Sequence, residues 1–135
     1  TELGVKEIHP LVAEHCTKRT VNIERCKKII IASAKQCQRS HFPVIKEPNT
    51  MVKWLNEPRE QCFAGVIGAK NRLKKFNYNK KLPIYILIGP EGDFSVKELD
   101  LLKEFGVKLF SLGNRKLRAE TATQATLSIL NELLD

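Results

Sequence analysis

The sequence predicts an α/β fold in which a mostly parallel sheet is flanked by helices. Three apolar stretches each run into a turn that contains a glycine, at Gly68, Gly89 and Gly113. Stretches with helical periodicity alternate with these apolar stretches, which is typical of strand–helix units in a parallel sheet. The 135 residues contain no internal repeat and no low-complexity tract, so we expect residues 1–135 to form one domain.

The first half of the chain is expected to contain a strand, a long helix and a short helix. A strand is predicted over residues 6–14, an amphipathic helix over residues 22–37 and a loop over residues 39–45. Thr50 can cap a short helix that reaches Trp54 and ends before Pro58. The apolar face of the long helix consists of Ile23, Cys26, Ile30, Ala34 and Cys37.

The second half is expected to contain three strands, over residues 61–69, 82–89 and 107–113, with an exposed basic loop over residues 70–81. Ser95 and Glu98 form an S-x-x-E capping box, which predicts a helix that ends near Phe105. Leu99, Leu102 and Phe105 are expected to face the core. A last helix over residues 120–134 is apolar enough to be buried on two sides. Its apolar residues are Ala122, Ala125, Ile129 and Leu133, widened by Leu127, Leu130 and Leu134.

The charge of the chain favours a polyanionic partner, with nucleic acid as the first candidate. Lys and Arg number 23 against 15 for Asp and Glu, a formal net charge of +8. A basic surface that serves only solubility is an alternative of about equal weight.

The cysteines indicate a reducing compartment, and we expect a cytoplasmic protein. The four cysteines form no C-x-x-C pair, so neither a redox motif nor a zinc site is predicted. A metal held jointly by His15, Cys16, Cys26, Cys37 and His41 is disfavoured because ligand spacing is absent. No apolar run approaches the roughly 20 residues that span a bilayer, so no membrane partner is expected.

The three glycine turns predict a ligand site at one edge of the sheet. Ligands of parallel α/β sheets bind beyond the carboxyl ends of the strands, although each turn alone is more typical of an ordinary strand–helix connection. The stretch GPEGDFS lacks the lysine of a Walker loop, and no G-x-G-x-x-G fingerprint is present. Glu91 and Asp93 would repel a polyphosphate, so a cationic ligand without phosphate fits better. The two carboxylates could instead hold a metal or face solvent.

Four motifs carry a family resemblance that spans essentially the whole chain. The stretches ELGV, QCQRSHFPVI, LIGPEGDFS and LGNRKLRAETA, in that order, resemble the RsmE family of SPOUT-class methyltransferases. Members of that family use S-adenosylmethionine to methylate the N3 of a uridine in 16S ribosomal RNA of the small subunit. The resemblance implies a C-terminal deep trefoil knot, a homodimer, and residues 1–135 as the methyltransferase domain. The family begins with an N-terminal PUA-like RNA-binding domain, which we expect to be absent from this chain.

The resemblance also implies roles for individual residues. S-adenosylmethionine is expected to contact both glycine turns, through Leu87, Ile88, Gly89, Pro90, Glu91, Gly92, Leu112, Gly113, Asn114, Leu117, Arg118, Glu120, Thr121 and Ala122. Arg118 is the expected catalytic residue, because its guanidinium offers a fixed fork of donors to the base or its phosphate. The RNA, as 16S ribosomal RNA or the small subunit, is expected to contact Arg39, Arg72, Lys74, Lys75, Arg115 and Lys116. The family usually carries acidic residues where this chain has Ala32 and Lys35.

Two alternatives stay open at this point. Arg118 could be structural, paired with Glu120 or Glu91. The chain could also be a non-catalytic RNA-binding module that keeps the fold, in which Phe76 and Tyr78 of the basic loop stack on bases. Local packing of these two rings is at least as compatible with the sequence. No general base is evident, and His9, His15 and His41 are expected to be structural or surface residues.

Overall fold

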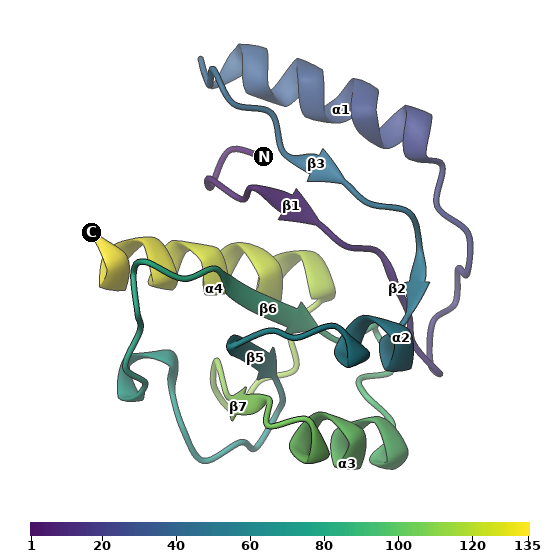
Figure 1. Ribbon diagram of the computed structural model, residues 1–135, viewed down its shortest axis with the longest axis vertical. Coiled ribbons are helices and arrows are strands. Elements are labelled where there is room, and N and C mark those ends of the chain that lie inside the picture. The colour runs from purple at the N-terminus through teal and green to yellow at the C-terminus, as the bar shows by residue number, and fades with distance from the viewer.

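A parallel three-stranded sheet lies at the centre of the computed structural model, which describes residues 1–135 (Figure 1). Strand β5 (Gln61–Gly65) is in the middle, between β6 (Ile84–Ile88) and β7 (Lys108–Phe110). The register pairs Gly65 with both Ile88 and Phe110, so the carboxyl ends of all three strands meet at one edge. The predicted α/β class with a parallel sheet flanked by helices is confirmed.

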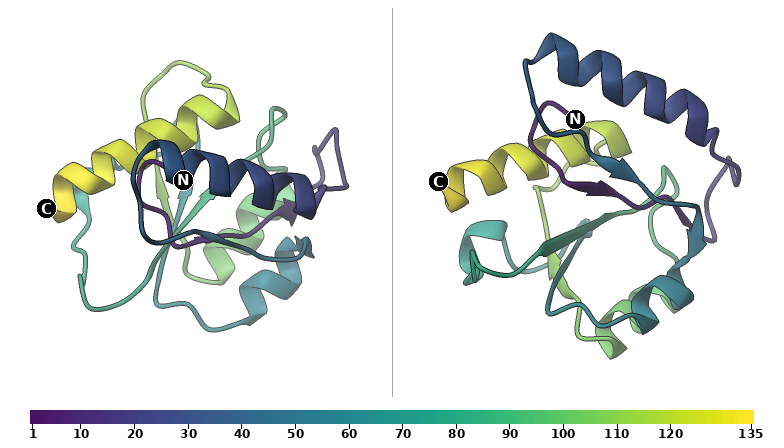
Figure 2. Two further views of the ribbon diagram at one scale, coloured as in Figure 1. Left: turned by 90° about the horizontal axis from the view of Figure 1, so that it is seen from above. Right: turned by 45° about the horizontal axis from the view of Figure 1, so that its top comes forward.

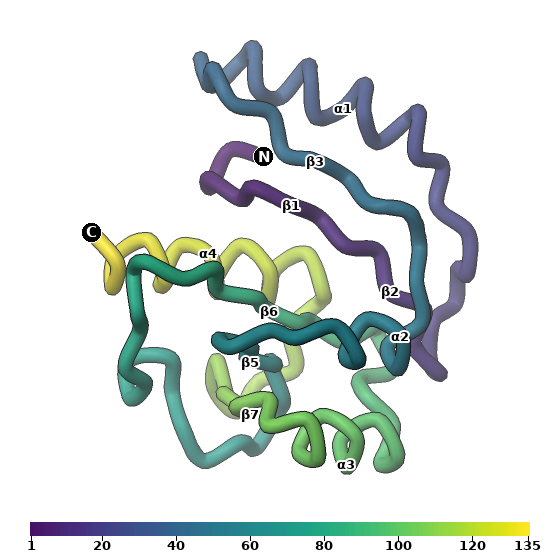
Figure 3. Tube along the Cα trace, in the orientation of Figure 1, coloured from purple at the N-terminus to yellow at the C-terminus, as the bar shows by residue number.

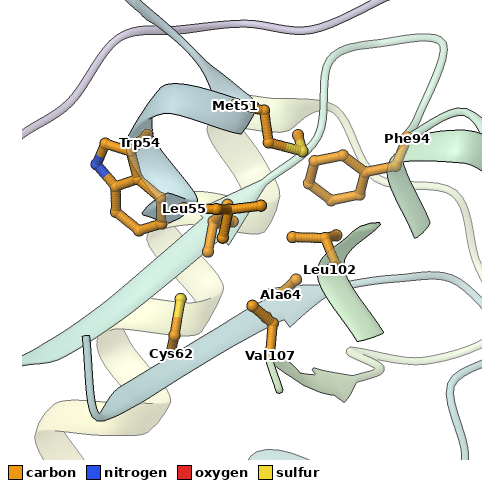
Figure 4. Close-up of a cluster of buried hydrophobic side chains, with 9 residues drawn as sticks. Met51, Trp54, Leu55, Cys62, Ala64, Phe94, Leu102 and Val107 are labelled. Carbon is orange, nitrogen blue, oxygen red and sulfur yellow. The ribbon is translucent and has the colours of Figure 1, made fainter. Parts of the chain in front are cut away.

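The two faces of this sheet bury different sets of side chains, because successive residues of a strand point to opposite faces. On β5, Cys62 and Ala64 join a cluster under helices α2 (Met51–Asn56) and α3 (Val96–Glu104), shown in Figure 4. Phe63, between them in sequence, joins a second cluster with Phe110 and residues of helices η1 (Leu73–Lys75) and α4 (Ala119–Leu134). The central sheet is therefore covered on both faces.

The N-terminal segment forms a separate layer outside α4. Strands β1 (Glu7–Ile8) and β3 (Val44–Ile45) pair in parallel, as do β2 (Leu11–Val12) and β4 (Asn49–Thr50). Helix α1 (Ile23–Gln36) is outermost, and α2 and α3 lie on the far side of the molecule, as the right-hand view of Figure 2 shows. The single strand predicted over residues 6–14 is interrupted at Pro10, which has no N–H to donate to a strand ladder.

Helices α2 and α3 begin at their predicted caps, Thr50 and Ser95, and α1 begins directly after Asn22, the first residue of its predicted range. Asn22 accepts a hydrogen bond from the Arg25 N–H at 2.9 Å, and Thr50 accepts one from the Lys53 N–H at 3.3 Å. At the start of α3, the Glu98 N–H donates to the Ser95 hydroxyl at 3.2 Å, and the Ser95 N–H donates to the Glu98 carboxylate at 2.9 Å. Both bonds of the predicted capping box are therefore present.

Two expectations about burial are wrong. Phe105 follows the last residue of α3 and is 41% exposed, while Leu102 is fully buried. In α4 the buried residues are Thr126 and Leu130, and the two-sided burial that was expected is absent, since Ile129 and Leu133 are 40% and 37% exposed.

The loop over residues 70–81 is partly a core element and not a freely exposed loop. It contains η1, whose Leu73 is buried. The rings of Phe76 and Tyr78 lie 5.1 and 5.3 Å from the Phe63 ring, centroid to centroid. The Tyr78 hydroxyl donates to the Leu73 carbonyl at 2.7 Å. Local packing of these aromatic rings, and not their display to bases, is what the structure supports.

Candidate functional site

A hollow opens at the edge of the central sheet where the three parallel strands end. The space between its lining residues is about 520 Å³, a volume that includes the open solvent at its mouth. The turn after β5 contributes Gly65, Val66 and Ile67, and the end of β6 with its turn contributes Ile88, Gly89, Pro90 and Asp93. The segment after β7 and the start of α4 contribute Leu112, Gly113, Arg115, Lys116, Leu117, Ala119 and Ala122.

The turn after β6 is tight and held by its own hydrogen bonds. The Asp93 N–H donates to the Pro90 carbonyl at 2.8 Å, and the Phe94 N–H donates to the Asp93 carboxylate at 2.8 Å. Asp93 has a φ of +63°, a left-handed conformation that few residues other than glycine, asparagine and aspartate adopt. The turn therefore places a carboxylate beside the hollow in a defined orientation.

The segment after β7 is tied to the basic loop. The Ser111 N–H donates to the Asn71 carbonyl at 2.9 Å, and an Arg72 Nη1 donates to the Ser111 carbonyl at 3.3 Å. The Ser111 hydroxyl also donates to the Gly113 carbonyl at 3.0 Å and accepts from the Gly113 N–H at 3.1 Å. Gly113 has a φ of +142°, which side chains disfavour. This local network gives the turn one shape.

The structure brings together half of the residues that were predicted to contact the cofactor. Ile88, Gly89, Pro90, Leu112, Gly113, Leu117 and Ala122 line the hollow. Leu87 instead points into the cluster under α2 and α3. Six others lie outside the lining and are exposed, namely Glu91, Gly92, Asn114, Arg118, Glu120 and Thr121.

Sequence reasoning missed four residues of the lining, among them Val66 and Ile67. Gly68 could have pointed to them, because it predicted a third turn at the same edge of the sheet. It did not by itself indicate that the two apolar residues before it would line the hollow. Arg115 and Lys116, which were predicted to bind RNA, line the hollow as well. Asp93 is its only carboxylate.

Arg118 immediately precedes α4 and is exposed. Its side chain makes no capping hydrogen bond, and neither Glu120 nor Glu91 forms an ion pair with it. The structural pairing that was the alternative for Arg118 is therefore absent. Its guanidinium remains free to meet a ligand near the mouth of the hollow.

The other residues that were predicted to bind RNA lie on two surfaces. Arg72, Lys74 and Lys75 are exposed around η1, next to the segment after β7. Arg39 follows α1, is half-buried, and donates to the Thr1 carbonyl. The solvent face of α1 adds Arg25, Lys28 and Lys35, all exposed. Of the residues predicted to bind RNA, Arg39 is therefore far from the basic residues beside the hollow.

Neither a metal cluster nor a membrane helix is found. No three side chains among His, Cys, Asp and Glu are close enough together to hold a metal ion. No helix has the length and apolarity that crossing a bilayer requires.

A model of the family described as RNA methyltransferase domain matches residues 1–131, which include the whole lining of the hollow. The chain belongs to the RNA methyltransferase family. The family expected from the sequence motifs is thereby confirmed. Among curated relatives, ribosomal RNA small subunit methyltransferase E of Rickettsia conorii is 35% identical over 126 residues, which is 90% of this chain and 52% of that protein.

Solved structures of the family share the fold. A methyltransferase from Legionella pneumophila, in complex with the cofactor SAM, matches with a TM-score of 0.87 and 30% identity, over 98% of this chain and 57% of that one. A ribosomal RNA small subunit methyltransferase E from Neisseria gonorrhoeae, bound to S-adenosyl methionine, matches with a TM-score of 0.87 and 26% identity, over 98% and 56% of the two chains. The chain spans about half the length of the curated relatives that it matches.

Proposed function

We propose that this domain transfers a methyl group from S-adenosylmethionine to the N3 of a uridine in 16S ribosomal RNA. The observation that carries the proposal is the hollow where three parallel strands end, in a chain whose fold matches two structures bound to S-adenosylmethionine. Its relatives named for ribosomal RNA methylation support the RNA substrate. The choice of N3 rests on the motif resemblance.

The residues around the hollow suit this cofactor. S-adenosylmethionine, when bound, supplies the methyl group as a sulfonium cation that carries an adenosine and no phosphate. Val66, Ile67, Leu112 and Leu117 offer apolar surface to the adenine, and the Asp93 carboxylate favours a cationic ligand. We assign direct contacts to the lining residues, and outer contacts to Glu91, Gly92, Asn114, Glu120 and Thr121.

The chain's contribution to the reaction is alignment and charge stabilisation. The two hydrogen-bonded turns hold the edge of the sheet where the ligand binds in one conformation. This lowers the entropic cost of aligning the methyl donor with the methyl acceptor. Methylation at N3 requires the uracil to lose a proton, and the negative charge that develops on the base needs a nearby donor. Arg118, free of any partner in the folded chain, is the residue that we assign to this task.

The RNA is proposed to approach from the side of the basic residues. Arg115 and Lys116 at the hollow and Arg72, Lys74 and Lys75 around η1 would contact its phosphates. A PUA-like domain is proposed to add RNA contacts beyond residues 1–135. The Arg39 side chain already donates to the Thr1 carbonyl, so we assign it a smaller contribution to RNA binding. With ribosomal RNA as the substrate, the protein belongs in the cytoplasm.

A titration with S-adenosylmethionine in a calorimeter tests the function directly. The wild-type chain should bind the cofactor, and Gly113→Val should bind far more weakly. The reason is strain at a φ of +142° and not a clash, because a Cβ at Gly113 would meet only Arg72 Nη1 at 3.7 Å.

Gly106→Val is the matched control, because Gly106 also has a positive φ, of +73°, and lies outside the hollow. It should lower the melting temperature without a selective loss of cofactor affinity. Absence of binding by the wild-type chain would leave the alternative of a non-catalytic RNA-binding module. Unchanged affinity in a folded Gly113→Val variant would overturn the assignment of the site.

A further inference from the structure

His15 reaches the turn after β6 from a segment far away in sequence. It belongs to the loop between β2 and α1, which Figure 3 lets the reader follow to the connection between β6 and α3. The His15 Nδ1 lies 3.0 Å from the Gly92 carbonyl oxygen and 3.0 Å from the Asp93 carbonyl oxygen. Carbonyl oxygens only accept hydrogen bonds, so Nδ1 carries the hydrogen and donates to both. That donor is present whether or not Nε2 is also protonated.

A second bond anchors the same loop beside His15. The Glu14 N–H donates to the Glu98 carboxylate at 2.7 Å. The other oxygen of this carboxylate accepts from the Ser95 N–H in the capping box of α3. The loop is therefore joined to the start of α3, the helix that follows the turn. This bond is made by the residue before His15, so it also fixes the backbone position of His15.

The contact between His15 and the turn is also a close steric one. A Cβ placed on Gly92 would lie 2.7 Å from the His15 Cβ, a separation that real Cβ atoms essentially never show. Gly92 itself has no left-handed φ, so the close approach, and not backbone conformation, makes glycine necessary here. We call the contact of His15 with Gly92 and Asp93 the His15 clasp.

We propose that His15 is a positioning residue that holds the turn over residues 90–93 in its cofactor-binding shape. The proposal rests on the proposed function. Asp93 lines the hollow in an uncommon left-handed conformation, which needs support from its surroundings to persist. The His15 clasp fixes the two carbonyls at the end of the turn, and so fixes the peptide groups that lead into Asp93 and Phe94. Without the clasp, the cofactor would have to select this conformation from several, which lowers its apparent affinity.

Three variants separate the hydrogen bonds from the shape of the ring. His15→Phe keeps a planar ring and removes the donor, whereas His15→Gln keeps an N–H donor on a side chain of similar reach. His41→Phe is the matched control, because His41 is exposed and bonds only to its neighbour Ser40, at 3.1 Å. Each variant is measured for S-adenosylmethionine affinity by calorimetry, for melting temperature, and for amide hydrogen exchange at Asp93 and Phe94 without ligand.

We expect His15→Phe to bind S-adenosylmethionine about tenfold more weakly, the loss that one N–H donor shared between two carbonyls accounts for. Its amides at Asp93 and Phe94 should exchange faster, while its melting temperature stays close to that of the wild type. In methyl transfer the KM for S-adenosylmethionine should rise and kcat should be nearly unchanged, because the bound turn is the same. His15→Gln should recover most of the affinity, and His41→Phe should match the wild type.

Gly92→Ala tests the same contact from the other side. Its added methyl pushes His15 away and leaves the imidazole intact, so it should also weaken binding and speed exchange, even if His15→Phe fails to fold. Unchanged affinity and exchange in folded His15→Phe or Gly92→Ala, with a wild type that binds, would overturn the His15 clasp. A wild type that does not bind would instead refute the proposed function, and hydrogen exchange would still test the clasp.

Discussion

Arg118 has a position that invites a test of catalysis. Its exposed side chain has no partner in the folded chain. Arg118→Ala should therefore leave the melting temperature and S-adenosylmethionine affinity nearly unchanged while most methyl transfer is lost. An interaction made mainly in the transition state appears in turnover and not in ground-state binding. The measurement is methyl transfer to RNA, with a PUA-like domain joined to the chain.

Two controls make the Arg118 result interpretable. Arg25→Ala removes an equal charge on the distant α1 and should retain turnover at saturating RNA. Glu120→Ala should retain turnover at saturating S-adenosylmethionine, because no ion pair joins Glu120 to Arg118 and only an outer contact to the cofactor is removed. Joint loss of cofactor affinity and turnover in Arg118→Ala, reproduced by Glu120→Ala, would restore the structural role. Full turnover in Arg118→Ala would exclude both roles.

Cys62 carries a pH dependence of stability. Burial in the cluster under α2 and α3 raises the pKa of its thiol to about 11, although the positive charge of Arg59 opposes this. The raised pKa means that the folded state favours the neutral thiol. The contribution of the buried neutral thiol to the free energy of unfolding is therefore fully present below about pH 9. It is lost as the pH rises toward about 11.

Urea unfolding of the wild type and Cys62→Ala at several values between pH 8 and pH 11 isolates this contribution. The stability difference between the two proteins should shrink as the pH rises, because only the wild type must bury an ionising thiol. Cys37→Ala, which alters an exposed cysteine, should keep a constant difference from the wild type. A constant difference for Cys62→Ala would contradict the shifted pKa.

At the scale of elements, α4 combines two surfaces of different use. Its first turn contributes Ala119 and Ala122 to the hollow, while its last turns leave Ile129 and Leu133 more than a third exposed. We propose that this exposed strip is the contact of a homodimer, since apolar side chains gathered on one face favour association. The two-sided burial that the sequence suggests would then be completed by a second copy.

The proposed homodimer contact can be tested by adding one negative charge to the exposed apolar strip of α4 and, in a separate variant, one to the opposite side of the helix. Ile129→Glu should convert a dimer into a monomer at micromolar concentration, as measured by sedimentation velocity. Gln124→Glu adds the same charge at an exposed position on the opposite side of the helix and should leave the dimer intact. A wild-type chain that sediments as a monomer, or an Ile129→Glu variant that stays dimeric, would refute this interface.

The elements that could be predicted are those specified by neighbouring residues. The caps at Thr50 and Ser95 and the periodicity of the helices are local, and they place the helix starts to within a residue. Strands β3 and β4 have only two residues each and depend on distant partners at the N-terminus. Nothing in their own sequence signals them, because so short a strand exists only through its pairing.

The candidate site could likewise be predicted from the sequence only in part. The glycine turns after β6 and β7 were evident from sequence, because each follows an apolar strand and precedes a helix. The part played by Val66 and Ile67 follows from the strand order β6-β5-β7, which puts their turn between the other two. His15 meets a carbonyl 77 residues away, and sequence alone suggested only a surface or structural histidine.

For the whole molecule, we propose that the C-terminal segment passes through a loop to form the trefoil knot that the motifs imply. The proposal rests on the motif resemblance, and the Ser111 N–H bond to the Asn71 carbonyl places the segment after β7 beside the loop through which it would pass. Pulling the chain from its two ends should then give an unfolded length shorter than the contour of about 3.3–3.6 Å per residue. Extension to the full contour would show that no knot is present.

Every strand pair in the molecule is parallel, and this has a consequence for how the protein is made. Parallel neighbours need a long crossover, so no hairpin can form early and folding has a high contact order. A ribosome must synthesise the chain as far as Ala122 before the lining of the hollow is complete. A ligand of the hollow can therefore bind only after the hollow has formed. It stabilises the native state by slowing unfolding and does not speed up folding.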